Sequence, residues 1–215
     1  MKHYIEITLI DNADINLFSL WSKVFQQIHL GLVEMQDNQG QVPIGLSFPE
    51  YVIGEKYSVL GSKLRLFAND EAGLKQFDTA KWLARLSDYV HCTSIRPVPE
   101  KIIGYALYQR EQPKTNPDRL ARRYAKRHGV DFDTALNGLV DLKSTKKPLN
   151  SDYKMQFRYC EMTKKKISSP FIRLKSMSSE QVFCLWIKKI PADTKTSATY
   201  FSSYGLSAVS SVPEF

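Results

Sequence analysis

Residues 2–34, KHYIEITLIDNADINLFSLWSKVFQQIHLGLVE, hold the pattern that decides the fold of the N-terminal part. Over residues 2–10 apolar and polar side chains alternate well enough to predict a β-strand, and its apolar positions include Tyr4, Ile7 and Leu9. Asp14 or Asn16 can then cap a helix over residues 15–34. Along this helix apolar residues recur every three or four positions and predict one buried stripe: Phe18, Trp21, Phe25, Ile28 and Leu32.

The following segments extend this pattern into an α+β domain. They predict a strand, a second strand, a helix and a third strand, at residues 43–48, 63–67, 70–89 and 93–98. The resulting order strand–helix–strand–strand–helix–strand is the ferredoxin-like arrangement, a small sheet with two helices on one face. We therefore expect a ferredoxin-like domain over residues 1–98, with a junction marked by Pro97 and Pro99.

The second part, residues 99–215, is expected to be a separate domain. Strands are predicted at residues 102–110, 171–176, 182–189 and 199–204, and helices at residues 116–129 and near 131–141. Residues 142–169 are rich in Lys and Ser and include the aromatic residues Tyr153, Phe157 and Tyr159. This insertion is interpreted as a mostly exposed hairpin or loop, which either touches a partner or is simply solvated.

Composition and charge narrow the class of protein. With 43% hydrophobic and 24% charged residues the chain is of globular type, and no apolar run approaches the roughly 20 residues of a membrane span. No signal peptide precedes the first strand, and the three widely spaced cysteines are expected to be reduced thiols, so we expect a cytoplasmic protein. Residues 1–100 carry 9 Lys/Arg against 12 Asp/Glu, whereas residues 101–128 carry 8 against 2. Such concentrated positive charge indicates a polyanion-binding surface.

The clearest local signal is residues 116–129, NPDRLARRYAKRHG, which predict a capped basic helix. Asn116 can be the N-cap, Pro117 suits the first helical position, and Gly129 can end the helix in the left-handed conformation. Five cations fall on one face at spacings of three and four: Arg119, Arg122, Arg123, Lys126 and Arg127. Their mutual repulsion costs about 1–2.5 kcal/mol. A nucleic-acid backbone on this face would relieve it, although the helix alone does not distinguish RNA from DNA.

Histidine is the residue type that we consider for a catalytic role. RNA can be cut without a metal because its 2′-hydroxyl is itself a nucleophile, and imidazole suits the proton transfer that this reaction needs. Of the four histidines, His29 flanks the buried stripe of the first helix, a position where a structural hydrogen bond is the commoner role. Neither clustered metal ligands nor a phosphate-binding or dinucleotide-binding motif occurs, so no metal and no cofactor are expected.

Several short stretches, in order, make the chain similar to the type I-F CRISPR repeat-processing endoribonucleases. The N-terminal ones are HY at 3–4, QIHLGLV at 27–33, IGLSFP at 44–49 and REQPKTNPDRLARR at 110–123. The C-terminal ones are FIRLKSMS at 171–178, FCLWI at 183–187 and SSYGLS at 202–207. Each is weak alone, but together they cover nearly the whole chain. Two departures are Lys126, where the family pattern has arginine, and the longer insertion at 142–169.

The resemblance implies roles for individual residues. His29 occupies the catalytic histidine position, Ser176 that of the serine that constrains the ribose at the cut, and Tyr204 that of the tyrosine beside the histidine. Arg110 and Gln112 correspond to the pair that reads base edges, which suits the bidentate contacts of these side chains with guanine and adenine. Phe183 corresponds to the aromatic residue that stacks on the terminal base pair. The five cations of the basic helix correspond to the phosphate-binding helix.

The resemblance thus implies an endoribonuclease that needs no metal, binds the hairpin of CRISPR repeat RNA and cuts at the 3′ base of the stem. It also implies that the enzyme stays on the mature guide RNA and contacts other subunits of the type I-F surveillance complex. Two alternatives remain open on the residues alone. One is a non-cleaving RNA-binding subunit of a ribonucleoprotein complex, and the other is a DNA-binding regulator that uses the same helix.

Overall fold

The computed structural model describes residues 1–112, 116–141, 156–162, 167–176 and 179–215. Its contacts divide the chain into two compact units, each with its own apolar core. Unit 1 consists of residues 1–111 together with residues 168–215, and unit 2 consists of residues 112–167. The mixed α and β class predicted from the sequence is confirmed.

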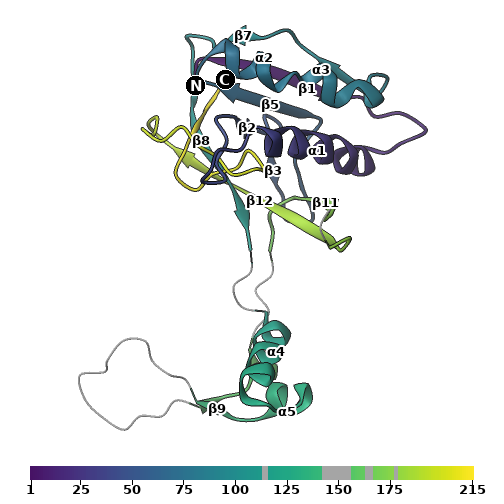
Figure 1. Ribbon diagram of the computed structural model, residues 1–215, viewed down its shortest axis with the longest axis vertical. Helices are drawn as coiled ribbons and strands as arrows, with labels where there is room; N and C mark the ends of the chain where they lie inside the picture. Colours follow the sequence, from purple (N-terminus) through teal and green to yellow (C-terminus); the bar gives the residue numbers. More distant parts are fainter. Residues whose placement is uncertain (113–115, 142–155, 163–166, 177–178) are drawn as a thin grey trace. The chain divides into compact units, whose positions relative to one another are not determined.

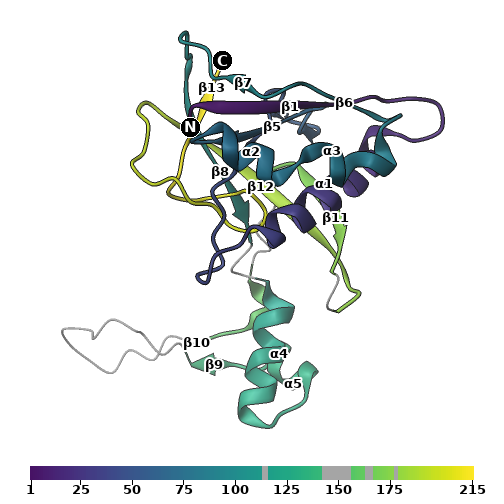
Figure 2. The same ribbon diagram turned by 45° about the horizontal axis from the view of Figure 1, so that its top comes forward.

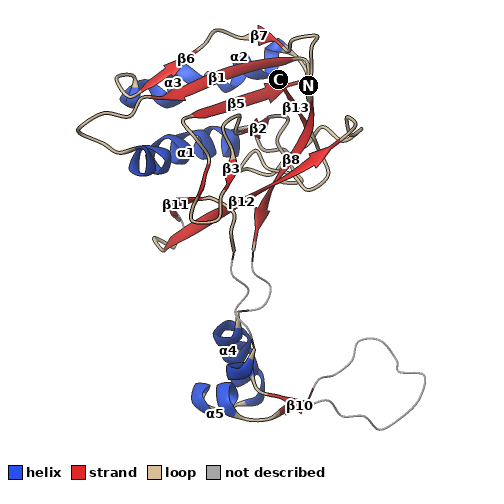
Figure 3. Ribbon diagram, turned by 180° about the vertical axis from the view of Figure 1, so that it is seen from behind, coloured by secondary structure: helices blue, strands red, loops and turns tan. Residues whose placement is uncertain are grey.

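The first sheet of unit 1 is antiparallel, and its strands lie in the order β2 (Gly45–Ser47), β5 (Lys63–Ala68), β1 (His3–Leu9) and β6 (Val90–Cys92). The short β7 (Arg96–Pro97) pairs with the start of β1. Figures 1 and 3 show one face of this sheet covered by helices: α1 (Leu17–Glu34), α2 (Glu71–Phe77), α3 (Thr79–Leu83) and the 3₁₀ turn η1 (Ala84–Leu86). A small separate hairpin pairs β3 (Val52–Ile53) with β4 (Ser58–Val59).

The helices begin where their capping residues predict. Asn16 caps α1 by accepting a hydrogen bond from the Ser19 amide at 2.9 Å. Of the predicted apolar stripe only Phe18 lies at the surface, with 47% exposure, because it sits in the first turn. The single helix expected at 70–89 is instead broken at Asp78, which has a left-handed backbone (φ 48°) and caps α3 with its side chain. An Asp tolerates this conformation because its carboxylate bonds to the local backbone.

The second sheet of unit 1 is also antiparallel and has the strand order β11 (Phe171–Lys175), β12 (Val182–Ala192), β8 (Gly104–Glu111) and β13 (Val212–Glu214). It shares one apolar core with the first sheet. The segment between β2 and β3 also contacts the second sheet, where the Tyr51 hydroxyl donates to the Ile187 carbonyl of β12 at 3.1 Å. The boundary expected at residues 98/99 therefore falls inside unit 1, because residues 99–111 and 168–215 pack onto the N-terminal part.

Unit 2 is a small helical unit (Figure 2). It contains α4 (Pro117–His128), α5 (Phe132–Asn137), a two-stranded pairing of β9 (Val140–Asp141) with β10 (Gln156–Phe157), and the 3₁₀ turn η2 (Tyr159–Glu161). Its core is formed by Ala121, Ala125 and Ala135. Small side chains at these positions let α4 and α5 approach each other closely.

The Lys-rich insertion predicted at 142–169 lies mostly outside the described residues. In its described part, Gln156–Phe157 pair with β9, the residues at 156–162 are exposed or half-buried, and the ring of Tyr159 packs against Tyr124 of α4 with centroids 6.0 Å apart. Phe157 in turn contacts Tyr159 edge-to-face. Tyr159 thus packs against the core of unit 2, and Phe157 packs against Tyr159. The third aromatic residue of the segment, Tyr153, lies outside the described residues. Within the described residues no helix is long and apolar enough to cross a bilayer.

A buried tyrosine links neighbouring strands of the second sheet. The Tyr108 hydroxyl donates to Glu214 Oε1 at 2.9 Å and lies 3.3 Å from the Phe48 carbonyl oxygen. Burial, followed by the negative charge of Glu214, raises the pKa of Tyr108 and keeps the phenol protonated. Lys189 Nζ lies 2.6 Å from the same Glu214 oxygen. One carboxylate thus joins β8, β12 and β13.

Replacing Tyr108 with Phe removes this donor, and we expect the stability of unit 1 to fall by about 1.5–3 kcal/mol, because the bond is made to a charged group. The measurement is the urea midpoint of the loss of tryptophan fluorescence. Tyr105→Phe on the same strand is the matched control, since the Tyr105 hydroxyl makes no hydrogen bond within the described residues. Equal midpoints for the two variants would show that the Tyr108 hydroxyl does not support the fold.

Candidate active site

The candidate site is built around a turn at residues 202–206. A strand was predicted at 199–204, but the structure has only an isolated bridge there, between Val42 and Phe201. Beyond this bridge the backbone closes a local turn. The Ser202 amide donates to the Leu206 carbonyl at 2.9 Å, and the Ser202 hydroxyl donates to the same oxygen. Serine side chains favour such turns because they compete for backbone partners.

Gly205 holds this turn against the first sheet. Its backbone is left-handed (φ 66°), and its amide donates to the Ser202 carbonyl at 2.7 Å. Its own carbonyl accepts from the amide of Leu46 in β2 at 2.9 Å. A Cβ at this position would collide with the side chain of Leu46. Position 205 therefore requires glycine both for its backbone conformation and for its close approach to β2.

His29, on α1, meets this turn through a backbone carbonyl. Its Nδ1 lies 2.7 Å from the carbonyl oxygen of Ser203. A carbonyl oxygen only accepts hydrogen bonds, so Nδ1 must carry the hydrogen. In the neutral imidazole the lone pair then resides on Nε2. The turn thus selects the tautomer in which Nε2 can take a proton.

Tyr204, the next residue of the turn, fixes the plane of the imidazole. The two rings are stacked, with centroids 4.2 Å apart and an interplanar angle of only 4°. The hydrogen bond points Nδ1 at the Ser203 carbonyl, and the stacking on Tyr204 prevents the imidazole from rotating about the axis of that bond. Together they leave His29 one orientation, with its side chain only partly buried.

Arg110 and Phe183 extend this group along the second sheet. The guanidinium of Arg110, near the end of β8, lies over the ring of Tyr204 at 5.7 Å and over the ring of Phe183, on β12, at 5.5 Å. Both distances are within the range of a cation–π interaction. Four of the predicted site residues therefore form a row in which each contacts the next: His29, Tyr204, Arg110 and Phe183.

Ser176 and Gln112 each lie directly after the end of a strand. Ser176 follows the last residue of β11, where its amide donates to the Gln181 carbonyl at 2.9 Å and its hydroxyl accepts from the Ser179 amide at 3.3 Å. Ser176 does not belong to the row of contacts formed by His29, Tyr204, Arg110 and Phe183. Gln112 follows the last residue of β8 and is exposed. It lies two residues after Arg110 but belongs to unit 2.

The basic helix of unit 2 is α4. Asn116 caps it by accepting from the Asp118 amide at 3.0 Å, and Gly129 ends it in the left-handed conformation (φ 67°). All five cations of the predicted stripe are exposed: Arg119, Arg122, Arg123, Lys126 and Arg127. The opposite face is used for packing, with Ala121 and Ala125 buried. The helix therefore presents its charge to solvent and its small residues to the core of unit 2.

The sequence analysis did not identify two features of the candidate site. The Ser203 carbonyl, which orients His29, belongs to the backbone, and Gly205 acts through its conformation. The stretch SSYGLS contained the signal, since serines followed by a glycine are typical of turns. Within the described residues no group of three or more His, Cys, Asp or Glu side chains could hold a metal ion. The three cysteines are free, with Cys92 half-buried and the other two exposed.

The arrangement offers three chemical capabilities in one place. Nε2 of His29 is an oriented proton acceptor, Arg110 is a cation that suits a phosphate or a guanine edge, and the ring of Phe183 suits a nucleobase face. This combination fits a nucleic acid held beside a proton-transfer group.

Comparison with known proteins gives a consistent match along the chain. The family profile described as "CRISPR-associated protein (Cas_Csy4)" matches residues 4–215. Two curated proteins, each named "CRISPR-associated endonuclease Cas6/Csy4", are 30% identical over the full length of both chains; one is from Escherichia coli (strain UTI89 / UPEC) and the other from Pseudomonas aeruginosa (strain UCBPP-PA14). A solved structure titled "CRISPR associated protein Cas6" covers 100% of this chain and 99% of its own, at 11% identity and a TM-score of 0.30.

The geometry predicts that neutral His29 carries its hydrogen on Nδ1. Long-range ¹H–¹⁵N correlation spectra of histidine-labelled protein, recorded well above the ordinary imidazole pKa of about 6.5, separate the two tautomers. We expect the Nδ1–H pattern for His29, and we expect Gly205→Ala, which displaces the turn, to abolish this preference. The Nε2–H tautomer in the unaltered protein would show that the Ser203 carbonyl does not orient the ring.

Proposed function

The chain belongs to the Cas_Csy4 family of CRISPR-associated proteins, and from this premise we propose that it is a metal-independent endoribonuclease of type I-F systems. Its substrate would be the stem-loop of CRISPR repeat RNA, cut at the 3′ base of the stem. The observation that carries the proposal is the orientation of His29 by the Ser203 carbonyl and the Tyr204 ring. The first sheet with its helices would be a ferredoxin-like domain that supplies this histidine.

In the proposed reaction Nε2 of His29 accepts the proton of the 2′-hydroxyl on the nucleotide before the cut. The 2′-oxygen forms a bond to the adjacent phosphorus, and the bond from phosphorus to the 5′-oxygen of the next nucleotide breaks. That 5′-oxygen takes up a proton from the protonated imidazole or from water. The products are a 2′,3′-cyclic phosphate and a 5′-hydroxyl. The role of Tyr204 follows from its stack, since it would position His29 without exchanging a proton.

Ser176 is proposed to act on the ribose. Its hydroxyl lies at the end of β11, where it accepts a hydrogen bond from the Ser179 amide at 3.3 Å. A hydrogen bond from Ser176 to the sugar would hold the 2′-oxygen in line with the leaving oxygen. Such positioning accounts for much of the rate of a reaction in which the nucleophile belongs to the substrate.

RNA recognition is proposed to use both units. The five exposed cations of α4 would contact phosphates along the stem, where they position the hairpin without reading its sequence. Arg110 and Gln112 would read base edges near the lower end of the stem. Phe183 would stack on the terminal base pair. Because Arg110 and Phe183 are in serial contact with Tyr204 and His29, a base pair bound by them would lie next to the cut.

The family premise also extends to partners and location. We propose that the protein acts in the cytoplasm, keeps its cleaved hairpin and remains on the mature guide RNA with the other subunits of the surveillance complex.

We expect His29→Ala to lower the single-turnover cleavage rate of a repeat hairpin by about 10²–10⁴-fold, the usual contribution of a proton-transfer group. Hairpin affinity should stay within about tenfold, because the five phosphate-binding cations of α4 are unchanged. His91→Ala is the matched control, since His91 is exposed on β6 and should retain the full rate.

Two outcomes of this experiment would contradict the proposal. If His29→Ala kept more than about a tenth of the rate, the proton-transfer role would pass to another group, with His128 the next histidine to test. If the unaltered protein bound the hairpin and never cut it, the chain would be a non-cleaving RNA-binding subunit.

A second prediction separates phosphate contact from base reading. Arg123→Ala should weaken hairpins of all sequences by a similar factor and should lower the slope of log affinity against log salt by roughly 0.7–0.9. Arg110→Ala should cost about 1–3 kcal/mol on the preferred stem and much less on a stem with the contacted pair exchanged. The measurement is affinity for both stems across a salt series. Equal losses on both stems for Arg110→Ala would make Arg110 another phosphate contact and leave specificity to hairpin shape.

A further inference from the structure

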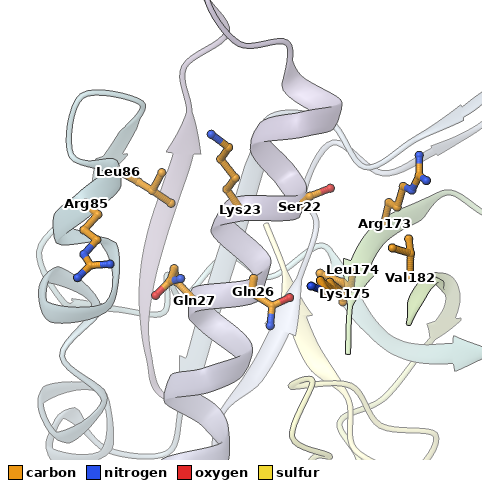
Figure 4. Close-up of a pocket in the computed structure, with 10 residues that line it drawn as sticks. All are labelled: Ser22, Lys23, Gln26, Gln27, Arg85, Leu86, Arg173, Leu174, Lys175 and Val182. Carbon is orange, nitrogen blue, oxygen red and sulfur yellow. The ribbon is translucent and has the colours of Figure 1, made fainter. Parts of the chain in front are cut away.

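Unit 1 contains a pocket of about 550 Å³ that none of the proposed site residues lines. It opens between the middle of α1, the turn η1 and the paired strands β11 and β12. Figure 4 shows its charged side chains on both sides of α1, with Arg85 on one side and Arg173 on the other. The lining contains four cations and two amides: Lys23, Arg85, Arg173, Lys175, Gln26 and Gln27. It includes neither an acidic nor an aromatic side chain.

Within the described residues, three of these cations lack the close carboxylate partner that some other cations of unit 1 have. Arg65, by comparison, binds Glu6 at 2.7 Å, and Lys189 binds Glu214 at 2.6 Å. Among the described residues Lys23, Arg85 and Arg173 form no ion pair. Lys175 has Glu180 at 3.8 Å, but both side chains are largely exposed, and such pairs contribute little. Positive charge without counter-charge in a concave surface attracts an anion.

Residues that line the pocket adjoin residues of the candidate active site along β11, β12 and α1. Lys175 immediately precedes Ser176, and Leu174, which also lines the pocket, pairs with Phe183 across the β11–β12 ladder. Gln26 lies three residues before His29 on α1, nearly one helical turn away. A strand of RNA whose cut bond lies at His29 therefore has this pocket beside it.

We propose that the pocket binds the ribose–phosphate backbone of the single-stranded RNA that flanks the repeat hairpin. The inference rests on the proposed function, because it takes the hairpin as the substrate of the neighbouring site. Cations lining a groove are the usual means of following a nucleic-acid backbone. Because the lining offers no aromatic ring for base stacking, the contact is with phosphates and ribose, and it is independent of sequence. The flank is either the 3′ strand that leaves after the cut or the 5′ strand that carries the guide.

The test measures binding without cleavage. Each RNA carries 2′-deoxyribose at the nucleotide before the cut, and three forms are compared: the hairpin ending just after the cut, the hairpin with about ten more nucleotides on its 3′ side, and the hairpin with about ten more on its 5′ side. The variant Lys23→Ala/Arg173→Ala removes two unpaired cations from the pocket. Arg96→Ala/Lys101→Ala, also exposed, removes the same charge outside the lining. Lys23→Arg/Arg173→Lys preserves the charge of the pocket.

We expect the unaltered protein to bind one extended hairpin more tightly than the bare one. The alanine pair should weaken that extended hairpin by about 2- to 30-fold and the bare hairpin by less than twofold, since each exposed contact is modest. The slope of log affinity against log salt for that RNA should fall by about 1.4, because each phosphate on a single strand contributes about 0.7. The charge-preserving pair and the control pair should retain the gain from the flank.

The two extended RNAs identify the source of the bound strand. Loss confined to the 3′-extended hairpin assigns the pocket to the leaving strand, and loss confined to the 5′-extended hairpin assigns it to the guide strand. Equal weakening of all three RNAs, or no gain from either flank in the unaltered protein, would overturn the inference. Failure of the proposed function is detected separately, as the absence of cleavage of an all-ribose hairpin. The affinities of the three RNAs can still be measured in that case, because binding does not depend on cleavage.

Discussion

The hydrogen bond between His29 Nδ1 and the Ser203 carbonyl is the constraint on which the candidate site depends. It joins residues 174 positions apart, so it exists only because both sheets of unit 1 share one core. The same turn is held to β2 by the bond between the Leu46 amide and the Gly205 carbonyl. Stability and chemistry are therefore coupled at this point: any change that separates the C-terminal segment from the first sheet also frees the imidazole.

Local features of the fold could be predicted from the sequence because they depend on neighbouring residues. Asn16 and Asn116 cap the helices that their positions indicated, and the buried stripe of α1 was recognisable from its spacing. The break at Asp78, the turn in place of a strand at 199–204, and the division between units were not predicted. Each is decided by contacts distant in the chain or by a single backbone conformation, neither of which periodicity reveals.

The candidate site could be predicted only in part for the same reason. His29 on sequence alone resembled a structural histidine, and in the structure it does make a structural hydrogen bond. A structural role and a catalytic role are compatible here, because the hydrogen bond made by Nδ1 leaves the lone pair on Nε2 to accept a proton. The contact of Arg110 with two aromatic rings had no local signal, because its three members come from β8, β12 and the turn at 202–206. Resemblance identified these residues one by one, and the structure shows which of them touch.

The central claim is that an oriented imidazole activates the substrate's own 2′-hydroxyl without a metal. Its most direct test is single-turnover cleavage, in the presence of EDTA, of two repeat hairpins that differ only at the nucleotide before the cut. One carries ribose there and the other 2′-deoxyribose. The account predicts that the ribose hairpin is cut at an undiminished rate and yields a 2′,3′-cyclic phosphate, while the deoxyribose hairpin is bound with similar affinity and stays intact. Cleavage of the deoxyribose hairpin, or activity that disappears with EDTA and returns with magnesium, would contradict it.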